Sequence, residues 1–179
     1  MEWRAWLLEN HHASTGIHLV FYKVKSNKES MRWEEAVKVA LCFGWIDSTV
    51  KKIDDEKRKQ YFSPRNPKSA WSKLNKTYIK ELIKNNLMHQ SGLEKIACSK
   101  TNSSWTALDS VEKGIIPIEL QTAFEKNPTA FENYNNFSPS YRKGYLYWLN
   151  EAKREATRER RIAEIIRLCK ENIKSRGAW

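Results

Sequence analysis

The feature that most constrains the fold is a pair of strand-like runs on either side of a short acidic turn. Residues 45–53 and 58–63 are rich in β-branched and aromatic side chains, and Asp54 and Asp55 lie between them. Two such runs joined by a polar turn predict a β-hairpin. Residues 17–24 form a third run, nearly continuous in apolar side chains, as in strands covered on both faces. We therefore expect a small three-stranded antiparallel sheet in the N-terminal half.

Elsewhere the apolar residues recur with helical spacing. Near the sheet, the stripes and stop signals predict a helix from Trp3, one from Arg32 to Gly44, one capped by Ser69 that runs to about residue 87, and a short one at 93–98 after a break at Ser91-Gly92. Further along, prolines 117, 128 and 139 stand at first-turn positions of three helices, and an amphipathic helix carries isoleucines 162, 165, 166 and 173.

The expected fold class is therefore α+β and mainly α-helical. A small three-stranded antiparallel sheet lies in the N-terminal half and is packed by helices, and the C-terminal half is helical. Residues 1–100 form the mixed part and residues 101–179 the helical part, and we expect the two to make one compact unit. A chain of 179 residues with 12% aromatic side chains can bury a core of ordinary size.

The net charge of +11 is unevenly distributed. Residues 51–76 carry nine basic and three acidic side chains, residues 141–179 carry eleven and five, and residues 109–137 carry two and five. The local balances are thus +6, +6 and −3. Such a field favours anionic partners, such as nucleic acid, acidic proteins or lipid headgroups, but it is equally what a solvated lysine-rich surface produces.

The cysteines and histidines give no sign of a metal or redox centre. Cys42, Cys98 and Cys169 form no Cys-x-x-Cys pair, and each lies in an apolar helical pattern, so we expect buried, reduced thiols in a reducing compartment. The four histidines show no metal-ligand spacing, and no cofactor is expected. No apolar run approaches the ~20 residues of a membrane span, and no signal peptide is visible, so we expect a cytoplasmic protein.

The most site-like stretch is 41–71. Trp45 and Asp47 share one face of the first hairpin strand. Arg65, at the far end of the hairpin, is a candidate bidentate partner for Asp47. With Ser69 and Trp71, these residues form a candidate pocket for a small anionic or aromatic ligand. The alternative is a core tryptophan and an ion pair that lock the hairpin to the following helix, and the sequence leaves both open.

Two other functions stay open on the residues alone. The first is an enzyme that uses Asp47 as a general acid or base in the same pocket, although no nucleophile or phosphate-binding motif accompanies it. The second is nucleic-acid binding by the basic run that contains Arg158, Arg160 and Arg161. Glutamates interleave with these arginines and can pair with them along a helix, as on an ordinary solvated surface.

Four segments together resemble the YdeI/OmpD-associated family of bacteriocin-protection proteins. They are Trp6-Leu7 with Asn10-His11, AVKVALCFGWID at 36–47, FSPRNPKSAWSKLN at 62–75, and SPSYRKGYLYWLNEAKREATRERRI at 138–162. The resemblance covers nearly the whole chain. The sequence departs from the family at Met88-His89-Gln90, where Met-x-Pro is usual before the small residue and glycine, and at Ala156, within what is usually Glu-Thr-Arg.

The resemblance implies a cytoplasmic bacterial protein linked to resistance against bacteriocins or cationic antimicrobial peptides, with no established reaction. Direct capture of a cationic peptide by a +11 chain is opposed by charge, unless the acidic region 109–137 does the binding. The combined expectation is a binding or adaptor protein whose partner is an acidic protein or a small anionic or aromatic ligand.

Overall fold

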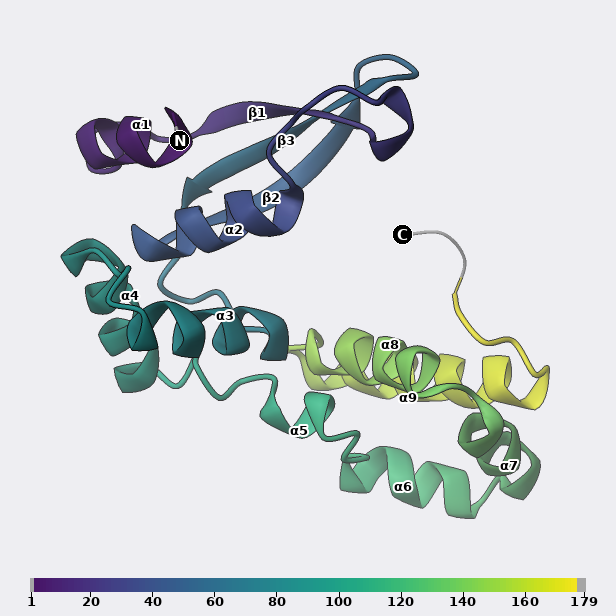
Figure 1. The fold of residues 1–179 in the computed structure, drawn as a ribbon. Helices are drawn as coiled ribbons and strands as arrows, with labels where there is room; N and C mark the ends of the chain where they lie inside the picture. The colour runs from purple at the N-terminus through teal and green to yellow at the C-terminus, as the bar shows by residue number, and fades with distance from the viewer. Residues whose placement is uncertain (1, 177–179) are drawn as a thin grey trace. The chain divides into compact units, whose positions relative to one another are not determined.

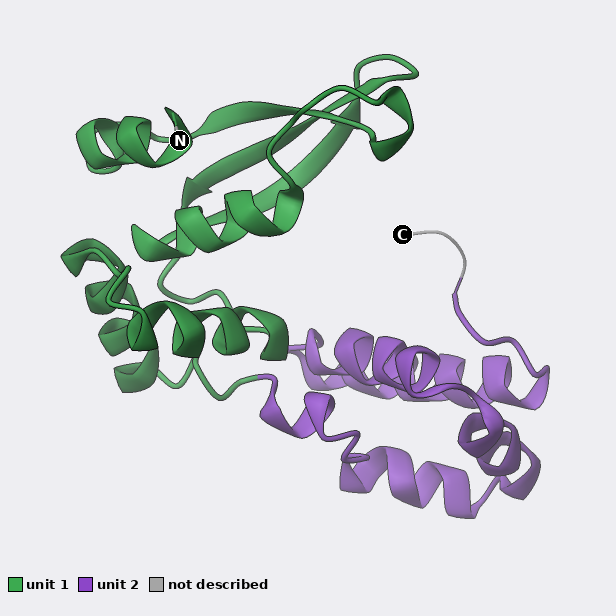
Figure 2. Cartoon of the chain, viewed as in Figure 1, with its two compact units in different colours: residues 1–107 green, residues 108–179 purple. Residues whose placement is uncertain are grey.

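The computed structural model describes residues 2–176. It divides the chain into unit 1, residues 1–107, and unit 2, residues 108–179 (Figure 2). Helices hold 54% of the chain and strands 13%, which confirms the expected mainly helical α+β class. Each unit has its own core and is described by itself. The sequence-based division at residue 100 and the expectation of one compact body stay predictions.

Unit 1 contains the expected three-stranded antiparallel sheet. Its strands are β1 (Ile17–Tyr22), β2 (Trp45–Lys52) and β3 (Lys57–Pro64), in the order β1-β3-β2, so that β1 and β2 are the edge strands (Figure 1). In the register Ile17 faces Phe62 and Trp45 faces Pro64, and a bulge interrupts β2 between Asp47 and Val50. The hairpin predicted around the acidic turn is confirmed.

The helices of unit 1 pack around this sheet. They are α1 (Glu2–Asn10), the short 3₁₀ helix η1 (Val24–Ser26), α2 (Trp33–Cys42), α3 (Lys73–Lys84) and α4 (Gln90–Thr101). The amphipathic stripe of α2 buries Ala36, Val37, Ala40 and Leu41. Figure 1 shows α2 lying along β2.

An aromatic cluster at the centre of the unit 1 core joins α1 to the sheet. The Trp3 ring lies 5.6 Å from Phe62 and 6.3 Å from Trp45, in edge-to-face geometry, and stacks on Trp6 at 5.5 Å. The Trp3 indole also donates a hydrogen bond of 3.1 Å to the Ala36 carbonyl on α2. Helix α1 is thus part of the core, because its aromatic side chains fill the space between sheet and helix.

Two helix boundaries differ from the expectation. Helix α3 begins at Lys73 and is capped by Ser72, whose hydroxyl accepts from the Asn75 amide, whereas Ser69 lies in a turn before the helix. Helix α4 is longer than predicted and contains Gly92 in its first turns, where a break was expected. A Cβ at Gly92 would lie 2.9 Å from the Leu41 carbonyl oxygen, so the glycine serves close backbone packing.

Unit 2 is helical throughout its described part. Its elements are α5 (Asp109–Glu112), α6 (Ile118–Glu125), α7 (Pro128–Asn136), α8 (Pro139–Asn150) and α9 (Glu155–Lys170). Pro128 and Pro139 open their helices as predicted, while Pro117 is the residue just before α6 and α5 was not predicted. The core gathers apolar residues of these helices, among them Leu120, Phe124, Tyr134, Leu149 and Ile165.

One cysteine assignment was wrong. Cys42 and Cys169 are buried thiols, but Cys98 is exposed because it lies on the outer face of α4. Burial raises the pKa of Cys169 to about 12, which keeps this thiol protonated. Across the described residues, no helix is both long and apolar enough to cross a bilayer.

Candidate functional site

The structure places Trp45, one of the five predicted pocket residues, inside the unit 1 core. Its side chain is 1% exposed and meets Trp6 edge-to-face at 5.8 Å. Its indole N–H donates to the His11 carbonyl at 3.1 Å. A ring buried to this degree offers no surface to a ligand, because its faces and its polar atom already have partners.

Asp47 connects the sheet to helix α2. One carboxylate oxygen, Oδ2, accepts hydrogen bonds from the indole N–H of Trp33 at 2.9 Å and from the side-chain amide of Gln60. Trp33 is the first residue of α2, and Gln60 is a buried residue of β3. The carboxylate of Asp47 on β2 therefore holds the start of α2 against the hairpin, because one of its donors lies on α2 and the other on β3.

Arg65 is 4% exposed and serves the corner between β3 and α3. Its guanidinium lies 3.8 Å from the ring centroid of Trp71 and donates to the carbonyl of Ala70. Burial lowers the pKa of Arg65 to about 10, and the nearby Asp47 charge opposes this shift. Within the described residues no ion pair joins Arg65 to Asp47, so the expected bidentate contact is not formed.

Ser69 and Trp71 complete this corner. The Ser69 hydroxyl donates to the Asn66 carbonyl at 2.8 Å and closes the turn. Trp71 is 1% exposed and packs against Trp105 at 5.1 Å. The five predicted residues are therefore close together along the chain but make two separate sets of contacts. Trp45 and Asp47 contact α1, α2 and β3, whereas Arg65, Ser69 and Trp71 form the corner before α3. These contacts are those of a structural lock, and a ligand role for the five residues stays a prediction.

The arginines proposed for nucleic acid are largely engaged within unit 2. Arg158 pairs with Glu119 at 3.2 Å. Arg161 donates to the Trp148 carbonyl and lies over the Trp148 ring at 5.0 Å. Arg160 is exposed and lines a shallow hollow with Arg167. Nucleic-acid binding by this run stays a prediction that nothing in these contacts strengthens.

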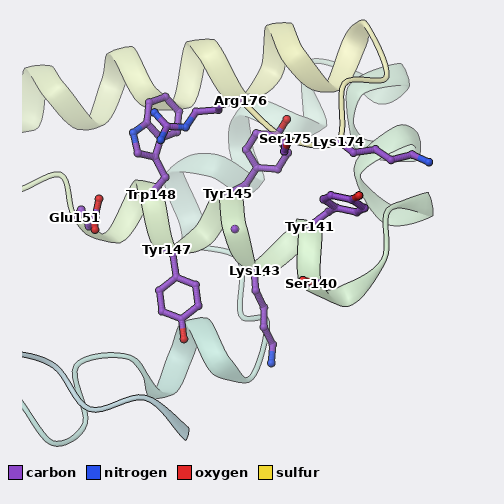
Figure 3. A pocket seen from close by; sticks show the side chains of 11 residues that line it. Ser140, Tyr141, Lys143, Tyr145, Tyr147, Trp148, Glu151, Lys174, Ser175 and Arg176 are labelled. Carbon is purple, nitrogen blue, oxygen red and sulfur yellow. The ribbon is translucent and has the colours of Figure 1, made fainter. Parts of the chain in front are cut away.

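An open groove of about 760 Å³ lies in unit 2 between α8 and the segment that follows α9 (Figure 3). Its aromatic lining comes from one helix, α8, which contributes Tyr141, Tyr145, Tyr147 and Trp148. Its basic side chains come from both walls: Lys143 from α8, and Lys174 and Arg176 from the returning segment. The groove therefore combines flat apolar surface with positive charge.

Two guanidinium groups lie over the ring of Trp148. Arg176 is 3.8 Å from its ring centroid and Arg161 is 5.0 Å away. Figure 3 shows the Arg176 side chain lying along the Trp148 ring at one end of the groove. Cation–π contacts of this kind hold the two guanidinium groups against the Trp148 ring and keep their positive charge beside the groove.

Two tyrosines hold the groove in shape. The Tyr145 hydroxyl donates to the Ile173 carbonyl at 2.7 Å, which fastens the segment after α9 to α8. Burial raises the pKa of Tyr145 to about 12, so this donor keeps its proton. The Tyr147 hydroxyl donates to Glu112 of α5 at 2.5 Å, and Lys143 pairs with the same carboxylate at 3.1 Å.

A glycine on α8 leaves open space in the lining of the groove. Gly144 faces it from α8, and a Cβ built at this position would have no neighbour within 4 Å. No side chain in the described residues therefore occupies this part of the space. A planar group could lie here against the tyrosines while an attached carboxylate or phosphate meets Lys174 or Arg176.

Sequence reasoning did not find this groove. The helix opened by Pro139 was predicted, but not that it would bury Tyr145 and leave Tyr141 44% exposed beside the groove. The wall formed by residues 174–176 comes from a segment that returns to α8 after α9. The charge balance of +6 over 141–179 was the available signal, but it did not identify which residues meet.

A second group of titratable side chains lies at the N-terminus of α4. The rings of His11 and His89 are 4.8 Å apart, and His89 stacks on Phe43. Burial lowers the pKa of His89, and His11 and Arg4 lower it further. Among the described residues, no group of three or more His, Cys, Asp or Glu side chains is placed to hold a metal ion.

Two family models match the chain, one in each half. Residues 1–95 match the family described as a domain of unknown function (DUF8412), and the chain belongs to that family. Residues 113–172 match the family described as "Bacteriocin-protection, YdeI or OmpD-Associated". The matched segment contains α8 and α9, whereas the groove wall at residues 174–176 lies beyond it. The resemblance noted from the sequence is thus confirmed for residues 113–172, although it had been expected over nearly the whole chain. Neither a curated protein nor a solved structure matches the chain.

Proposed function

We propose that this protein is a cytoplasmic binding or adaptor protein that acts in bacteriocin protection. We further propose that its ligand site is the groove between α8 and the segment after α9, called here the α8 groove. The observation that carries the proposal is the open groove with Trp148, Lys174 and Arg176 on its walls, whose α8 wall lies within the residues that match the bacteriocin-protection family. The ligand is a small anionic molecule with an aromatic or other flat group. The tyrosines supply the apolar contact and the basic side chains supply the charge.

Charge selects among the possible ligands. The lining carries three basic side chains and one acidic side chain, Glu151. Lys143 is paired with Glu112, while Lys174 makes no ion pair within the described residues. A cationic peptide would be repelled here. We therefore place the protective action in binding an anionic ligand or partner rather than in direct capture of the bacteriocin.

A ligand-detected NMR screen tests the groove. The probes are a set of aromatic carboxylates and aryl phosphates, with aromatic amines of the same size as a charge control. We expect the anions to bind to the wild type and the amines not to bind. Gly144→Leu would abolish anion binding, because the new side chain fills the open space without meeting a neighbour. Equal binding of anions and amines, or binding that survives Gly144→Leu, would remove the groove from the proposal.

A matched control separates the groove from general charge. Lys153→Gln removes one positive charge from the exposed loop between α8 and α9, outside the groove lining, whereas Lys174→Gln removes one from the wall. Only Lys174→Gln should weaken anion binding. In cells, a strain that lacks the gene should lose survival under a cationic antimicrobial peptide and regain it with the wild type but not with Gly144→Leu. Full rescue by Gly144→Leu would contradict a role of the groove in protection.

A further inference from the structure

The two edge strands of the unit 1 sheet differ in how they are protected from pairing with another strand. Edge strands expose unpaired backbone groups, and proteins protect them with lysines, bulges or covering elements. Strand β2 has two of these devices, a bulge between Asp47 and Val50 and the lysines Lys51 and Lys52. Strand β1, with the sequence IHLVFY, has no charged residue, proline or bulge. One edge is thus protected and the other is not.

Three residues of β1, His18, Val20 and Tyr22, point their backbone groups away from β3. The amide of Lys23 donates to Glu56 across β1 and β3, so odd-numbered residues of β1 point their backbone groups toward β3. Even-numbered residues therefore point away. The outward amide of Tyr22 already donates to the hydroxyl of Ser30. No hydrogen bond of the outward groups of His18 and Val20 is found within the described residues, so these two are able to pair.

An apolar groove of about 780 Å³ continues around this edge. Leu19 lies on the core face of β1 and Val20 on the opposite face, yet both line the groove together with Trp6 of α1 and Val39 of α2. A cavity that reaches both faces of a strand must pass along its open edge. Val20 itself is 53% exposed. Within unit 1 the edge of β1 is therefore uncovered and lies beside apolar surface.

Local charge makes a second copy of the same chain an acceptable partner here. The chain carries +11 overall, so most of its surfaces repel each other. The groove lining holds two acidic side chains, Glu2 and Glu35, and one basic side chain, Arg4, while β1 has no charge. Two copies that meet at this edge bring together neutral strands and avoid the basic regions at 51–76 and 141–179.

Symmetry also favours a second copy of the chain at the β1 edge. Two identical strands pair antiparallel about a two-fold axis perpendicular to the sheet, which leaves the core faces of both copies on the same side. The apolar grooves beside β1 then face each other and bury one another's surface. We propose that the protein forms a symmetric dimer by antiparallel pairing of β1 with β1 of a second copy, giving a continuous six-stranded sheet.

The outward groups fix the register of this pairing. If Leu19 lies opposite Leu19 of the second copy, His18 of each copy faces Val20 of the other, and all their outward N–H and C=O groups are satisfied. A register centred on Val20 would instead require the Tyr22 amide, which Ser30 already occupies. The pairing is therefore expected to centre on Leu19.

Sedimentation equilibrium on the full chain tests the proposal. We expect the mass to rise from 21.1 kDa toward that of a dimer, with a dissociation constant on the order of 10 µM, as for a modest interface. Val20→Lys places a charge within the paired segment, one residue from its centre, and should weaken the dimer at least about tenfold. Val50→Lys is the matched control, because Val50 is 47% exposed on the protected edge strand β2. Both variants replace a half-exposed valine, and thermal unfolding verifies that each remains folded.

Hydrogen exchange provides a second measurement. The amides of His18 and Val20 should exchange more slowly at high protein concentration, while those of β2 should not change. A chain that stays monomeric to hundreds of micromolar, or a dimer that Val20→Lys leaves intact, would overturn the proposal. A dimer weakened equally by Val50→Lys would do so too, since the effect would then be one of net charge. If the β1 edge pairs only with a different protein, the isolated chain will stay monomeric.

Discussion

Replacing Gly92 by alanine is expected to destabilise unit 1, although the same change in most helices is stabilising. Gly92 lies within α4, and its added methyl would lie 2.8 Å from the carbonyl carbon of Cys42 and 2.9 Å from the oxygen of Leu41, with the Cys42 oxygen closer still. Backbone atoms cannot rotate away as a side chain would. Either α4 or the last residues of α2 and the turn that follows them, at residues 41–43, must therefore move.

The magnitude follows from what this movement breaks. Overpacking costs about 1–3 kcal/mol. The shift also strains two hydrogen bonds that hold α4 to this turn, from the His89 amide to the Cys42 carbonyl at 3.0 Å and from the Ser91 hydroxyl to the Phe43 carbonyl at 3.1 Å, each worth about 1 kcal/mol. Helix propensity returns about 1 kcal/mol. The net loss in the free energy of unfolding is about 2–4 kcal/mol.

Gly144→Ala is the matched control, since Gly144 is also helical and a Cβ there meets nothing within 4 Å. It should raise the free energy of unfolding by about 0.5–1 kcal/mol. Urea unfolding followed by circular dichroism measures both. If Gly92→Ala proves as stable as the wild type, or if both variants shift in the same direction, the close packing of α4 on the Leu41–Phe43 turn is not the reason for the glycine.

Three further outcomes are expected. The pKa of His89 is lowered in the folded state, so the contribution of this residue to stability is present above pH ~6.5 and is lost as the pH falls below that value. Thermal unfolding at pH 5 and pH 7.5 should show this loss of stability. His89→Asn, which keeps a capping side chain, should make the difference between the two pH values smaller. Arg65→Lys should lower the free energy of unfolding by about 2 kcal/mol, because a lysine cannot both stack flat on Trp71 and reach the Ala70 carbonyl; an unchanged urea midpoint would contradict the lock. Iodoacetamide should label the exposed Cys98 in the native chain and spare the two buried thiols, and mass spectrometry showing equal labelling of all three would refute that assignment.

The sequence predicted those helices and strands whose formation depends on residues close together in the chain. The acidic turn at Asp54-Asp55 gave the hairpin, and Pro128 and Pro139 gave the starts of α7 and α8. Gly92 was misread because a glycine in a sequence indicates only conformational freedom. Its actual cause is the carbonyl of Cys42, which the fold brings against it from another element.

The candidate sites show the same limit more strongly. Asp47 takes its donors from Trp33 and Gln60, on two other elements, so a partner guessed from the end of the hairpin was the wrong one. The α8 groove depends on the Tyr145 hydroxyl meeting the Ile173 carbonyl, a contact between residues 28 apart in sequence. Residue types indicated which chemistry was present, but tertiary contacts decided which side chains were available.

The separate cores of the two units also distribute the tryptophans unevenly. Six of them, at positions 3, 6, 33, 45, 71 and 105, belong to unit 1, whereas Trp148 alone represents unit 2 within residues 108–176. Trp148 lies under two guanidinium groups, whereas the buried indole of Trp45 packs against the rings of Trp3 and Trp6. Intrinsic fluorescence will therefore report mainly on the sheet-containing unit. Melting of the helical unit can proceed almost unseen by emission while the far-ultraviolet helix signal falls.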